Sequence, residues 1–464
     1  MARTVKKATI LTPEEKLAQA FVPVAEQPYQ VPKNWCWIRL DALKVDANGF
    51  FDGDWILSEN MDSAGEVRLL QLSDIGIGEF IDKSDKHISE KTYRQLGCTP
   101  LHEGDVMISR MAEPIARSCI VPSFPYTVIT AVDVAVIRCN PSIVINCYLN
   151  YLCNAKWFTD LAFSLARGTT RVRITRKNLG DMPVPIPPLA EQQRIVDSIG
   201  SLFAKLDEAK EKAQVVVDGF EDRKAAILHK AFTGELTAGW RESNNINIDS
   251  WRMKSIESFC TSLKYGTARK SENKGSVVVI RMGNLQQGEI DWTDLAYTTD
   301  ETDIEKYHLE PNDVLFNRTN SAALVGKTSI YRGEYPAIYA GYLIKLDYDH
   351  DVIIGDYLNY ALNTQNAKKY CNAVKTDGVN QSNINAKKIG AFVIPVPSKE
   401  EQVRIVELLK GFIEKEKQAK ETAEQVIDQI EAMKKSILAR AFRGELGTND
   451  PADESAEELL KRIL

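Results

Sequence analysis

The sequence predicts an α+β protein with two mixed α/β domains separated by two long helices, which form an antiparallel coiled coil within an internal pseudo-two-fold repeat. Three observations predict this fold. The sequence repeats itself with a period of 210 residues, the repeated segments have a heptad pattern, and the segments before them contain short strand-like runs with frequent turn signals. At 464 residues the chain is long enough for two or three hydrophobic cores.

The repeat is clearest in two short motifs. Residues 191–196 (EQQRIV) return as residues 401–406 (EQVRIV), and residues 231–236 (AFTGEL) return as residues 441–446 (AFRGEL). Between these motifs the two copies align without a gap, and 21 of the 46 aligned residues are identical. Chance does not produce such a match, so the chain contains two copies of one ancestral unit.

The repeated segments are predicted to be helices that pack on each other, because apolar residues recur at spacings of four and three. The predicted seam positions are 195, 199, 202, 206, 209, 213, 216, 220, 223 and 227 in the first copy, and 405, 409, 412, 416, 419, 423, 426, 430, 433 and 437 in the second. Each seam has one charged interruption, Arg223 or Glu416. Packing of each stripe on its own domain is the alternative, but a helix of about 60–68 Å is too long for one small domain to cover.

The predicted boundaries follow from the repeat and from the composition of the segments around it. They are an N-terminal extension at 1–30, a first domain at 31–187, a first helix at 188–236, a second domain at 237–397, a second helix at 398–446 and a tail at 447–464. Thr12 and Pro13 indicate the start of a helix in the extension. Gly234 and Gly444 stand where helix C-caps are expected, and residues 455–464 predict a short amphipathic helix.

Composition excludes several classes of protein. Apolar residues make up 44% and charged residues 26%, and no apolar run approaches the roughly 20 residues that span a membrane. Eight cysteines without a Cys-x-x-Cys pair and only five histidines predict a cytoplasmic protein with reduced thiols and no metal site. The net charge of −6 argues weakly against nucleic-acid binding, but acidic residues concentrate in 191–222 and 400–432 and leave the question open.

Motifs for catalysis are missing from the sequence. It has no Gly-x-x-x-x-Gly-Lys-Ser/Thr phosphate loop, no Gly-x-Gly-x-x-Gly and no Gly-x-Ser-x-Gly. Residues 140–143 (NPSI) come nearest to a base-methyltransferase motif, but they lack the aromatic residue that stacks on a flipped base. The nuclease-like triplet 208–210 (EAK) lies in a predicted coiled-coil helix. We therefore expect no catalytic residue, no metal and no cofactor on this chain.

Basic and polar side chains recur in the predicted loops and suggest contacts with DNA. Lys and Arg neutralise phosphates, Arg reads guanine, and Asn or Gln reads adenine in the major groove. The predicted DNA-binding residues are Arg110, Arg167, Thr169, Arg171, Arg173, Arg176, Lys177, Lys264, Tyr265, Thr267, Arg269, Lys270, Asn317, Arg318, Asn320, Lys327, Asn380 and Gln381. A solvated surface is the alternative for each one taken singly. The dense cluster at 167–177 favours binding.

Taken together, the motifs resemble the specificity subunits of Type I restriction–modification systems. The resemblance rests on Pro-x-Pro before Glu-Gln-x-x-Ile-Val, on the Ala-Phe-x-Gly-Glu-Leu ending and on residues 377–384 (DGVNQSNI), and it covers about 31–464. It implies two target recognition domains that bind a bipartite, asymmetric site in double-stranded DNA. It also implies two modification subunits that methylate adenine with S-adenosylmethionine, and restriction subunits that use ATP and magnesium to translocate and cleave DNA. Residues 167–171 (RGTTR) depart from 377–380 (DGVN), so base-reading roles do not transfer to the first domain.

Other functions remain as alternatives. The chain could act as a stand-alone DNA-binding protein or as a coiled-coil scaffold that never meets DNA. It could also be a nuclease or methyltransferase that acts alone, which incubation with DNA, magnesium and methyl donor would reveal. A mobility-shift assay separates the scaffold from the DNA-binding alternatives.

Overall fold

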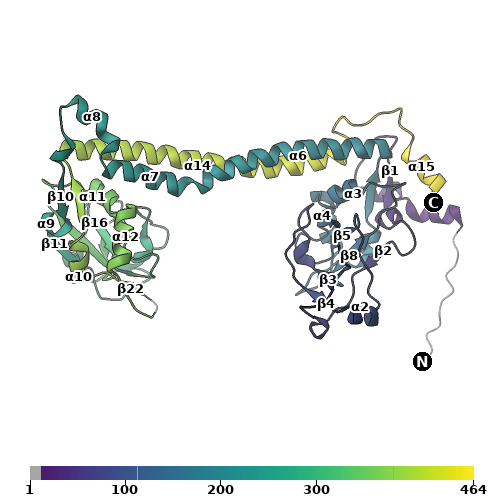
Figure 1. Cartoon of the computed structure of the whole chain (residues 1–464), viewed down its shortest axis with the longest axis horizontal. Coiled ribbons are helices and arrows are strands. Elements are labelled where there is room, and N and C mark those ends of the chain that lie inside the picture. Colours follow the sequence, from purple (N-terminus) through teal and green to yellow (C-terminus); the bar gives the residue numbers. More distant parts are fainter. Residues whose placement is uncertain (1–11, 112, 380, 464) are drawn as a thin grey trace. The chain divides into compact units, whose positions relative to one another are not determined.

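The computed structural model describes residues 12–111, 113–379 and 381–463, which leaves the predicted site residue Asn380 outside the described residues. The chain divides into two compact units. Unit 1 comprises Met1–Lys212 and Val426–Leu464, and unit 2 comprises Ala213–Gln425. Each unit contains one α/β domain and a part of both repeated helical segments (Figure 1).

Unit 1 is built around a four-stranded sheet, a three-stranded sheet and a two-stranded sheet. Its strands are β1 (Cys36–Arg39), β2 (Phe50–Asp52), β3 (Val67–Leu70), β4 (His87–Ile88), β5 (Val106–Ser109), β6 (Ser118–Ile120), β7 (Val128–Thr130), β8 (Val134–Ile137) and β9 (Pro183–Ile186). Its shorter helices are α1 (Pro13–Ala20), α2 (Glu90–Leu96), α3 (Asn146–Cys153), α4 (Lys156–Leu165), α5 (Arg176–Gly180) and α15 (Ala456–Ile463).

Unit 2 repeats these sheets and adds small hairpins. Its strands are β10 (Arg252–Ser255), β11 (Cys260–Tyr265), β12 (Val277–Ile280), β13 (Leu285–Gln286), β14 (Glu289–Ile290), β15 (Tyr297–Thr298), β16 (Val314–Asn317), β17 (Thr319–Asn320), β18 (Thr328–Ile330), β19 (Ala337–Tyr339), β20 (Leu343–Tyr348), β21 (Thr376–Asp377), β22 (Ser382–Asn383) and β23 (Val393–Val396). Its shorter helices are α8 (Ala238–Ser243), α9 (Ile256–Phe259), α10 (Glu301–Tyr307), α11 (Gly355–Leu362), α12 (Gln365–Val374) and α13 (Ala386–Gly390).

The two α/β domains have the same topology although their sequences have diverged. The sheet order β2-β8-β5-β6 of unit 1 corresponds to β11-β20-β16-β18 of unit 2, and β4-β3-β7 corresponds to β15-β12-β19. In the three-stranded sheets the β3–β7 and β12–β19 pairs are both parallel. β1 pairs with β9, and β10 pairs with β23, in the same antiparallel way. The structure therefore extends the repeat beyond the segments in which the sequence alone shows it.

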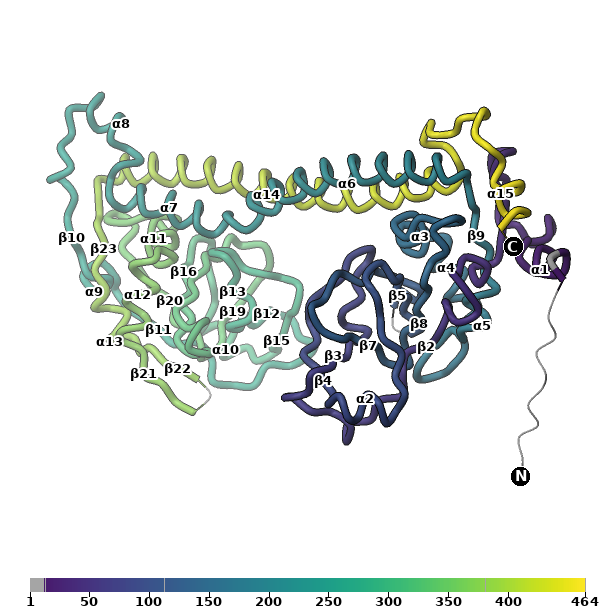
Figure 2. Tube along the Cα trace, turned by 45° about the vertical axis from the view of Figure 1, so that its right-hand side comes forward, coloured from purple at the N-terminus to yellow at the C-terminus, as the bar shows by residue number. Residues whose placement is uncertain are grey.

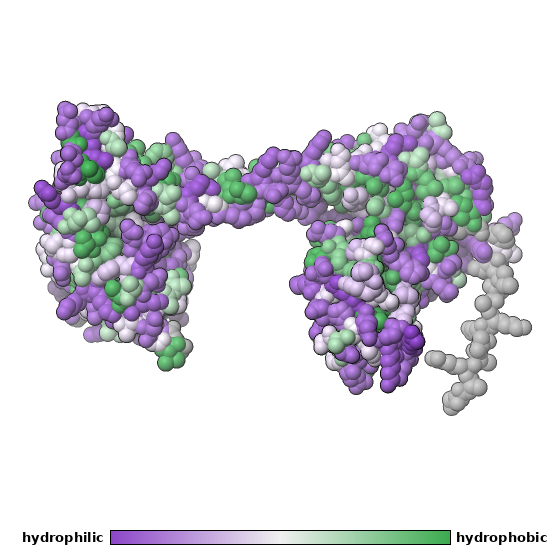
Figure 3. All heavy atoms as spheres, viewed as in Figure 1, coloured by the Kyte–Doolittle hydropathy of each residue, from purple (hydrophilic) through white to green (hydrophobic). Residues whose placement is uncertain are grey.

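The long helices are α6 (Leu189–Asp218), α7 (Phe220–Phe232) and α14 (Lys399–Ala441). Within unit 1, Lys210 Nζ lies 2.6 Å from Glu431 Oε1, and Asp207 pairs with Lys434. Residue numbers rise along α6 as they fall along α14, so the helices run antiparallel, as expected (Figure 2). Hydrophilic side chains dominate the visible surface of these helices (Figure 3).

Five of the twenty predicted seam positions were shifted by one residue. Positions 206, 213 and 220 and positions 416, 423 and 430 are at least partly buried, as predicted. At the alternate positions, however, residues 202, 209, 412, 419 and 433 are exposed, and their C-terminal neighbours are partly buried instead. These neighbours include lysines whose stems cover aromatic rings, with Lys434 Nζ 5.0 Å from the centre of the Phe203 ring. A search for apolar letters overlooks such amphipathic side chains.

The first helical segment was predicted to be one helix, but it is interrupted at Gly219 between α6 and α7. The cause lies in the charged seam position. Arg223 donates from Nε to Glu416 Oε2 (2.6 Å) and from Nη2 to the carbonyl of Val216 (2.8 Å). A Cβ at position 219 would stand 2.4 Å from Arg223 Nη1, so glycine makes room for the guanidinium. The second copy has Gln429 at the matching position, and α14 is continuous there.

The Glu-Gln pair that marks each repeat fastens the long helix to its domain through fully buried side chains. Gln192 Oε1 accepts from the backbone N–H of Ile145 (2.9 Å), and its Nε2 donates to the carbonyls of Ile143 (2.9 Å) and Pro187 (3.0 Å). Gln402 makes the same three kinds of bond in unit 2. Both amide hydrogens and the amide oxygen of each glutamine are therefore bonded to backbone groups. This explains why glutamine recurs at this position.

The helix ends follow the predicted caps. Thr12 and Glu15 form a capping box at α1 with Pro13 in the first turn. Gly234 (φ +83°) and Gly444 (φ +74°) adopt the left-handed conformation after the repeated helices. The amphipathic helix predicted near the C-terminus is α15. In the described part of the chain, no helix is both long enough and apolar enough to cross a membrane.

Candidate nucleic-acid interface

The predicted arginine cluster of unit 1 forms a hairpin, residues 167–173, which is closed by a single β-bridge and which we call hairpin 1. Arg167 and Arg173 exchange backbone hydrogen bonds, and both N···O distances are 2.9 Å. Met111, which follows β5, pairs with Arg173 on the other side. The N–H of Ile174 then donates to the carbonyl of Arg110 (2.9 Å). Backbone pairing thus fixes the base of hairpin 1 to the end of the central strand β5.

Two carboxylates hold the base of hairpin 1 in place. Asp52 lies 3.2 Å from Arg110 Nη1 through Oδ1 and 3.3 Å from Arg176 Nε through Oδ2. Asp133 forms an ion pair with Arg173. Arg110 is only 7% exposed, and burial, with Arg173 and Arg176 close by, lowers the pKa of its guanidinium against the opposing effect of Asp52. Three of the predicted DNA contacts, Arg110, Arg173 and Arg176, therefore form ion pairs within the protein.

The remaining cations of the cluster face solvent. Arg167, Thr169, Arg171 and Lys177 are exposed. Arg167 donates from Nη1 to the carbonyls of Ser164 (3.0 Å) and Ala166 (2.9 Å), which holds it against α4. Within the described residues, the side chains of Arg171 and Lys177 make no hydrogen bond or ion pair. These two are available to an incoming ligand.

Unit 2 carries an equivalent ribbon made of β21 and β22, which we call hairpin 2. Thr376 pairs with Asn383, and Asn383 pairs in turn with Thr319 of β17, the counterpart of Met111. The N–H of Ile384 donates to the carbonyl of Arg318 (2.9 Å), which matches the bond between Ile174 and Arg110. The two hairpins therefore occupy the same place in the two copies of the fold.

The base of hairpin 2 is held mainly by polar and aromatic groups, beside one ion pair between Lys375 and Asp377 (3.6 Å). Arg318 donates from Nη2 to Asn383 Oδ1 (3.0 Å), and its guanidinium lies 4.7 Å from the centre of the Tyr265 ring. Tyr265 Oη accepts from the backbone N–H of Ala386 (2.9 Å), and Asn383 Nδ2 donates to Thr319 Oγ1 (2.8 Å). Gln381 is exposed near the tip of hairpin 2.

The other predicted residues of unit 2 are spread around this ribbon. Lys264 pairs with Asp347 (2.9 Å), Arg269 pairs with Asp300, and Lys327 Nζ donates to Gln286 Oε1 (3.0 Å). Lys270 is exposed, and Asn320 is half-buried in β17. These residues contribute positive or polar surface, and carboxylates already pair with two of the four cations, Lys264 and Arg269.

Three predicted contacts are corrected by burial. Thr267 is 4% exposed and hydrogen-bonds Asp303, Asn317 is fully buried, and Arg110 has the contacts given above. A ligand cannot reach these side chains in this conformation, so they position the loops around them. The sequence search selected them because they are polar and lie next to strands, and it could not see that they point inward.

The sequence search also missed residues that shape the interface. Asp52 and Asp133 were passed over because carboxylates were not sought as DNA ligands. Tyr342 was overlooked as well. It is 49% exposed, and its carbonyl accepts from the N–H of Arg318 (3.0 Å). A tyrosine close to a predicted basic loop was the signal by which the sequence could have identified Tyr342.

Groups suited to catalysis do not gather at either hairpin. In the described residues no cluster of three or more His, Cys, Asp or Glu side chains is arranged to hold a metal ion. All eight cysteines are free. Burial raises the pKa of Cys36, Cys119 and Cys139 to about 12, so these thiols stay protonated at neutral pH.

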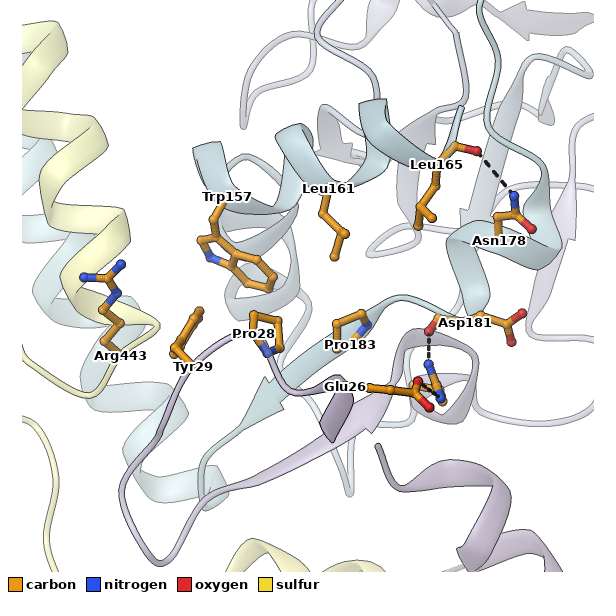
Figure 4. A pocket seen from close by; sticks show the side chains of 11 residues that line it. Glu26, Pro28, Tyr29, Trp157, Leu161, Leu165, Asn178, Asp181, Pro183 and Arg443 are labelled. Carbon is orange, nitrogen blue, oxygen red and sulfur yellow. Dashed lines mark hydrogen bonds and ion pairs between the residues drawn. The ribbon is translucent and has the colours of Figure 1, made fainter. Parts of the chain in front are cut away.

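A cavity of about 710 Å³ lies elsewhere in unit 1, between the N-terminal segment and α4 (Figure 4). Trp157, Leu161 and Pro183 line it with apolar surface. Two of its charged groups pair with each other, since Arg39 donates to Glu26 Oε2 (2.6 Å), and Arg39 also donates to the backbone carbonyl of Asp181 (2.7 Å). The residues of hairpin 1 do not line this cavity, so the interface is assigned from the hairpin geometry.

The sequence profile described as "Type I restriction modification DNA specificity domain" matches residues 51–216 and again residues 248–429. The chain belongs to this family. Each match covers one recognition domain together with part of the helical segment that follows it. The protein is thus a DNA specificity subunit of the Type I restriction–modification class, with two target recognition domains in one chain.

Individual relatives agree with the family match. The chain is 25% identical over 330 residues to the Type I restriction enzyme EcoKI specificity subunit of Escherichia coli K12, an alignment that covers 68% of this chain and 70% of the relative. It is 24% identical over 329 residues to the StySPI specificity subunit of Salmonella potsdam, with the same coverage of 68% and 70%. These relatives are specificity subunits by name.

Solved structures show the same fold. One match is a chain from a structure that describes complex assembly and conformational transition of the type I R-M system. The TM-score is 0.70 and the sequence identity is 20%, over 90% of this chain and all of that chain. The HsdS subunit from Thermoanaerobacter tengcongensis matches with a TM-score of 0.57 and 19% identity, over 91% of this chain and all of that one.

Proposed function

We propose that this specificity subunit recognises a bipartite, asymmetric site in double-stranded DNA, with one half-site read by each recognition domain. The observation that supports it most is the pairing of one topology with two unlike hairpins. Equivalent ribbons offer the same type of contact to DNA, and their different tips select different bases. Because the domains differ, the half-sites differ too.

The chain itself is non-catalytic in this proposal. Two modification subunits bind it and methylate adenine with S-adenosylmethionine, and restriction subunits add ATP- and magnesium-dependent translocation and cleavage. Two features support this division. The exposed basic residues suit phosphate binding, and the thiols with raised pKa values are poor nucleophiles. The long helices with their hydrophilic surface then provide the spacer and a docking surface for the partners.

The test exchanges one domain. The chain is expressed with its modification subunits, and methylated adenines are mapped on a sequence library. Replacement of residues 31–185 by the corresponding domain of another specificity subunit should change one half-site and leave the other half-site and the spacer intact. If both half-sites stay unchanged, the proposal fails. Absence of any DNA mobility shift with the intact complex would favour the scaffold alternative.

A further inference from the structure

We propose that Arg171 is the base-reading residue of hairpin 1 and that Gln381 has the corresponding role in hairpin 2. This inference rests on the proposed function and specifies which side chains set the sequence of each half-site. It predicts a guanine in the half-site of unit 1 and an adenine in the half-site of unit 2.

The arginines of unit 1 have different partners. Arg110, Arg173 and Arg176 each contact Asp52 or Asp133, so they are committed to holding the hairpin. Arg167 is turned toward the carbonyls of α4. Arg171 is exposed and, among the described residues, has no hydrogen-bond or ion-pair partner. Its five donors are therefore free.

The ribbon also holds Arg171 on a rigid base. Gly168 has φ +129°, and a Cβ there would stand 2.3 Å from the carbonyl oxygen of Arg171, so only glycine closes this tip. The neighbouring Ile174 is fully buried in the core of unit 1, and Val172 packs against the same core. A side chain carried on such a fixed backbone loses little conformational freedom when it binds.

A two-stranded ribbon has the right size for the major groove of B-DNA, which is about 12 Å wide and accepts such an element. In that groove a guanidinium can donate two parallel hydrogen bonds to O6 and N7 of guanine, and a glutamine amide pairs with N6 and N7 of adenine. Thr169 is also exposed on hairpin 1, where its methyl group could contact thymine.

Lys177 offers a matched control for Arg171. It is exposed, has no partner among the described residues, and lies on α5 beyond the base of the hairpin. A lysine outside the ribbon suits a phosphate contact. Such a contact contributes to affinity on every sequence and to the salt dependence, but carries no base preference.

The experiment compares Arg171→Gln with Lys177→Gln in the full complex with the modification subunits. Bound duplexes are selected from a random pool, and the affinity for the wild-type site is measured at several salt concentrations. Arg171→Gln should replace guanine by adenine at one position of one half-site and weaken binding to the original site roughly 10- to 100-fold. Lys177→Gln should leave the selected sequence unchanged and weaken binding to all sequences alike.

A third variant, Gln381→Arg, should change one position of the other half-site only. The inference is overturned if Arg171→Gln selects the wild-type sequence, or if it weakens all sequences equally, since either result makes Arg171 a phosphate contact or a bystander. Failure of the wild-type complex to select any split sequence would instead overturn the proposed function. The two failures are therefore distinguishable.

Discussion

Glu191 in unit 1 and Glu401 in unit 2 occupy the same position of the repeat, and both are fully buried, yet their surroundings differ. Each accepts a hydrogen bond from the indole of a tryptophan, Trp35 at 2.7 Å and Trp251 at 2.9 Å. Glu401 is then paired with the cation Arg241 at 2.6 Å. Within the described residues, no cation forms an ion pair with Glu191.

The remaining donors to Glu191 come from the C-terminal tail. Asn449 Nδ2 donates at 2.8 Å and Thr448 Oγ1 at 3.3 Å, and both are neutral. In unit 2 the equivalent donors, Thr237 and Arg241, lie on the segment that leads on into β10. The comparison teaches that the fold needs a hydrogen-bonded carboxylate at this junction, and that different segments can supply its donors.

The largest expected effect comes from Arg241→Met. It leaves the Glu401 carboxylate buried without its counter-charge, which should lower the free energy of unfolding of unit 2 by about 3–5 kcal/mol. Hydrogen exchange measured peptide by peptide would locate the loss in unit 2. The double variant Arg241→Met with Glu401→Gln removes both charges and should recover part of the stability. An unaffected unit 2 would show that Trp251 and Thr237 suffice, as the neutral donors do in unit 1.

A smaller loss is expected in unit 1 from Asn449→Ala. Glu191 keeps Trp35 and Thr448 but loses one donor, which should cost about 1–3 kcal/mol. Calorimetric unfolding of the full chain measures it. Asn244→Ala is the control, because this exposed side chain bonds only the carbonyl of Trp240 and should have little effect. Equal losses in the two variants would contradict the role given to the tail.

The two units should also differ in acid. In unit 2, burial acts to raise the pKa of Asp356, but hydrogen bonds from Arg332 and Lys410 outweigh it, so the pKa is lowered. A lowered carboxyl pKa stabilises the fold at neutral pH, and this contribution is lost as the pH falls below about 4. The matching positions in unit 1 are Cys147 and Gly200, which have no such pair.

Asp356→Asn tests this difference between the units. We expect it to lower the free energy of unfolding of unit 2 by about 1 kcal/mol at pH 7, because its partners are partly exposed. The deficit of the variant should be smaller at pH 3 than at pH 7, because the contribution of the lowered pKa is lost as the pH falls through the pKa of the folded state. Cys147→Ser in unit 1 should show no comparable pH dependence. A deficit of the same size at both pH values would assign the effect of Asp356→Asn to packing.

These contacts also show how far sequence reasoning can reach. The repeat, the two α/β domains and the antiparallel helices follow from identities and from heptad spacing, which are local signals. Five of the twenty seam positions were wrong by one residue, and at three of them the residue that packs instead is a lysine, which a search for apolar residues does not select. Arg110 and Asn317 looked like surface ligands because their burial depends on partners such as Asp52, which are distant in the sequence.

The smallest expected effect concerns the helix pair itself. Arg223 and Glu416 form an ion pair in unit 2, and the positions that match them in unit 1 hold Met433 and Leu206. Arg223→Met with Glu416→Leu would give unit 2 the apolar residues that unit 1 has at these two positions. Because the ion pair is partly exposed, its removal should change the stability by less than about 1 kcal/mol, with a gain as the expected sign.

Thermal unfolding of the full chain measures this change, and Arg223→Met alone is the control. The single variant leaves Glu416 half-buried beside an apolar side chain, so it should be less stable than the double variant. The guanidinium of Arg223 also donates a hydrogen bond to the carbonyl of Val216, which lies beside the helix break. Adding Gly219→Gln to the double variant should therefore close the break and raise the melting temperature further. A fall on this last step would mean that the break is set by packing in unit 2 and does not depend on Arg223.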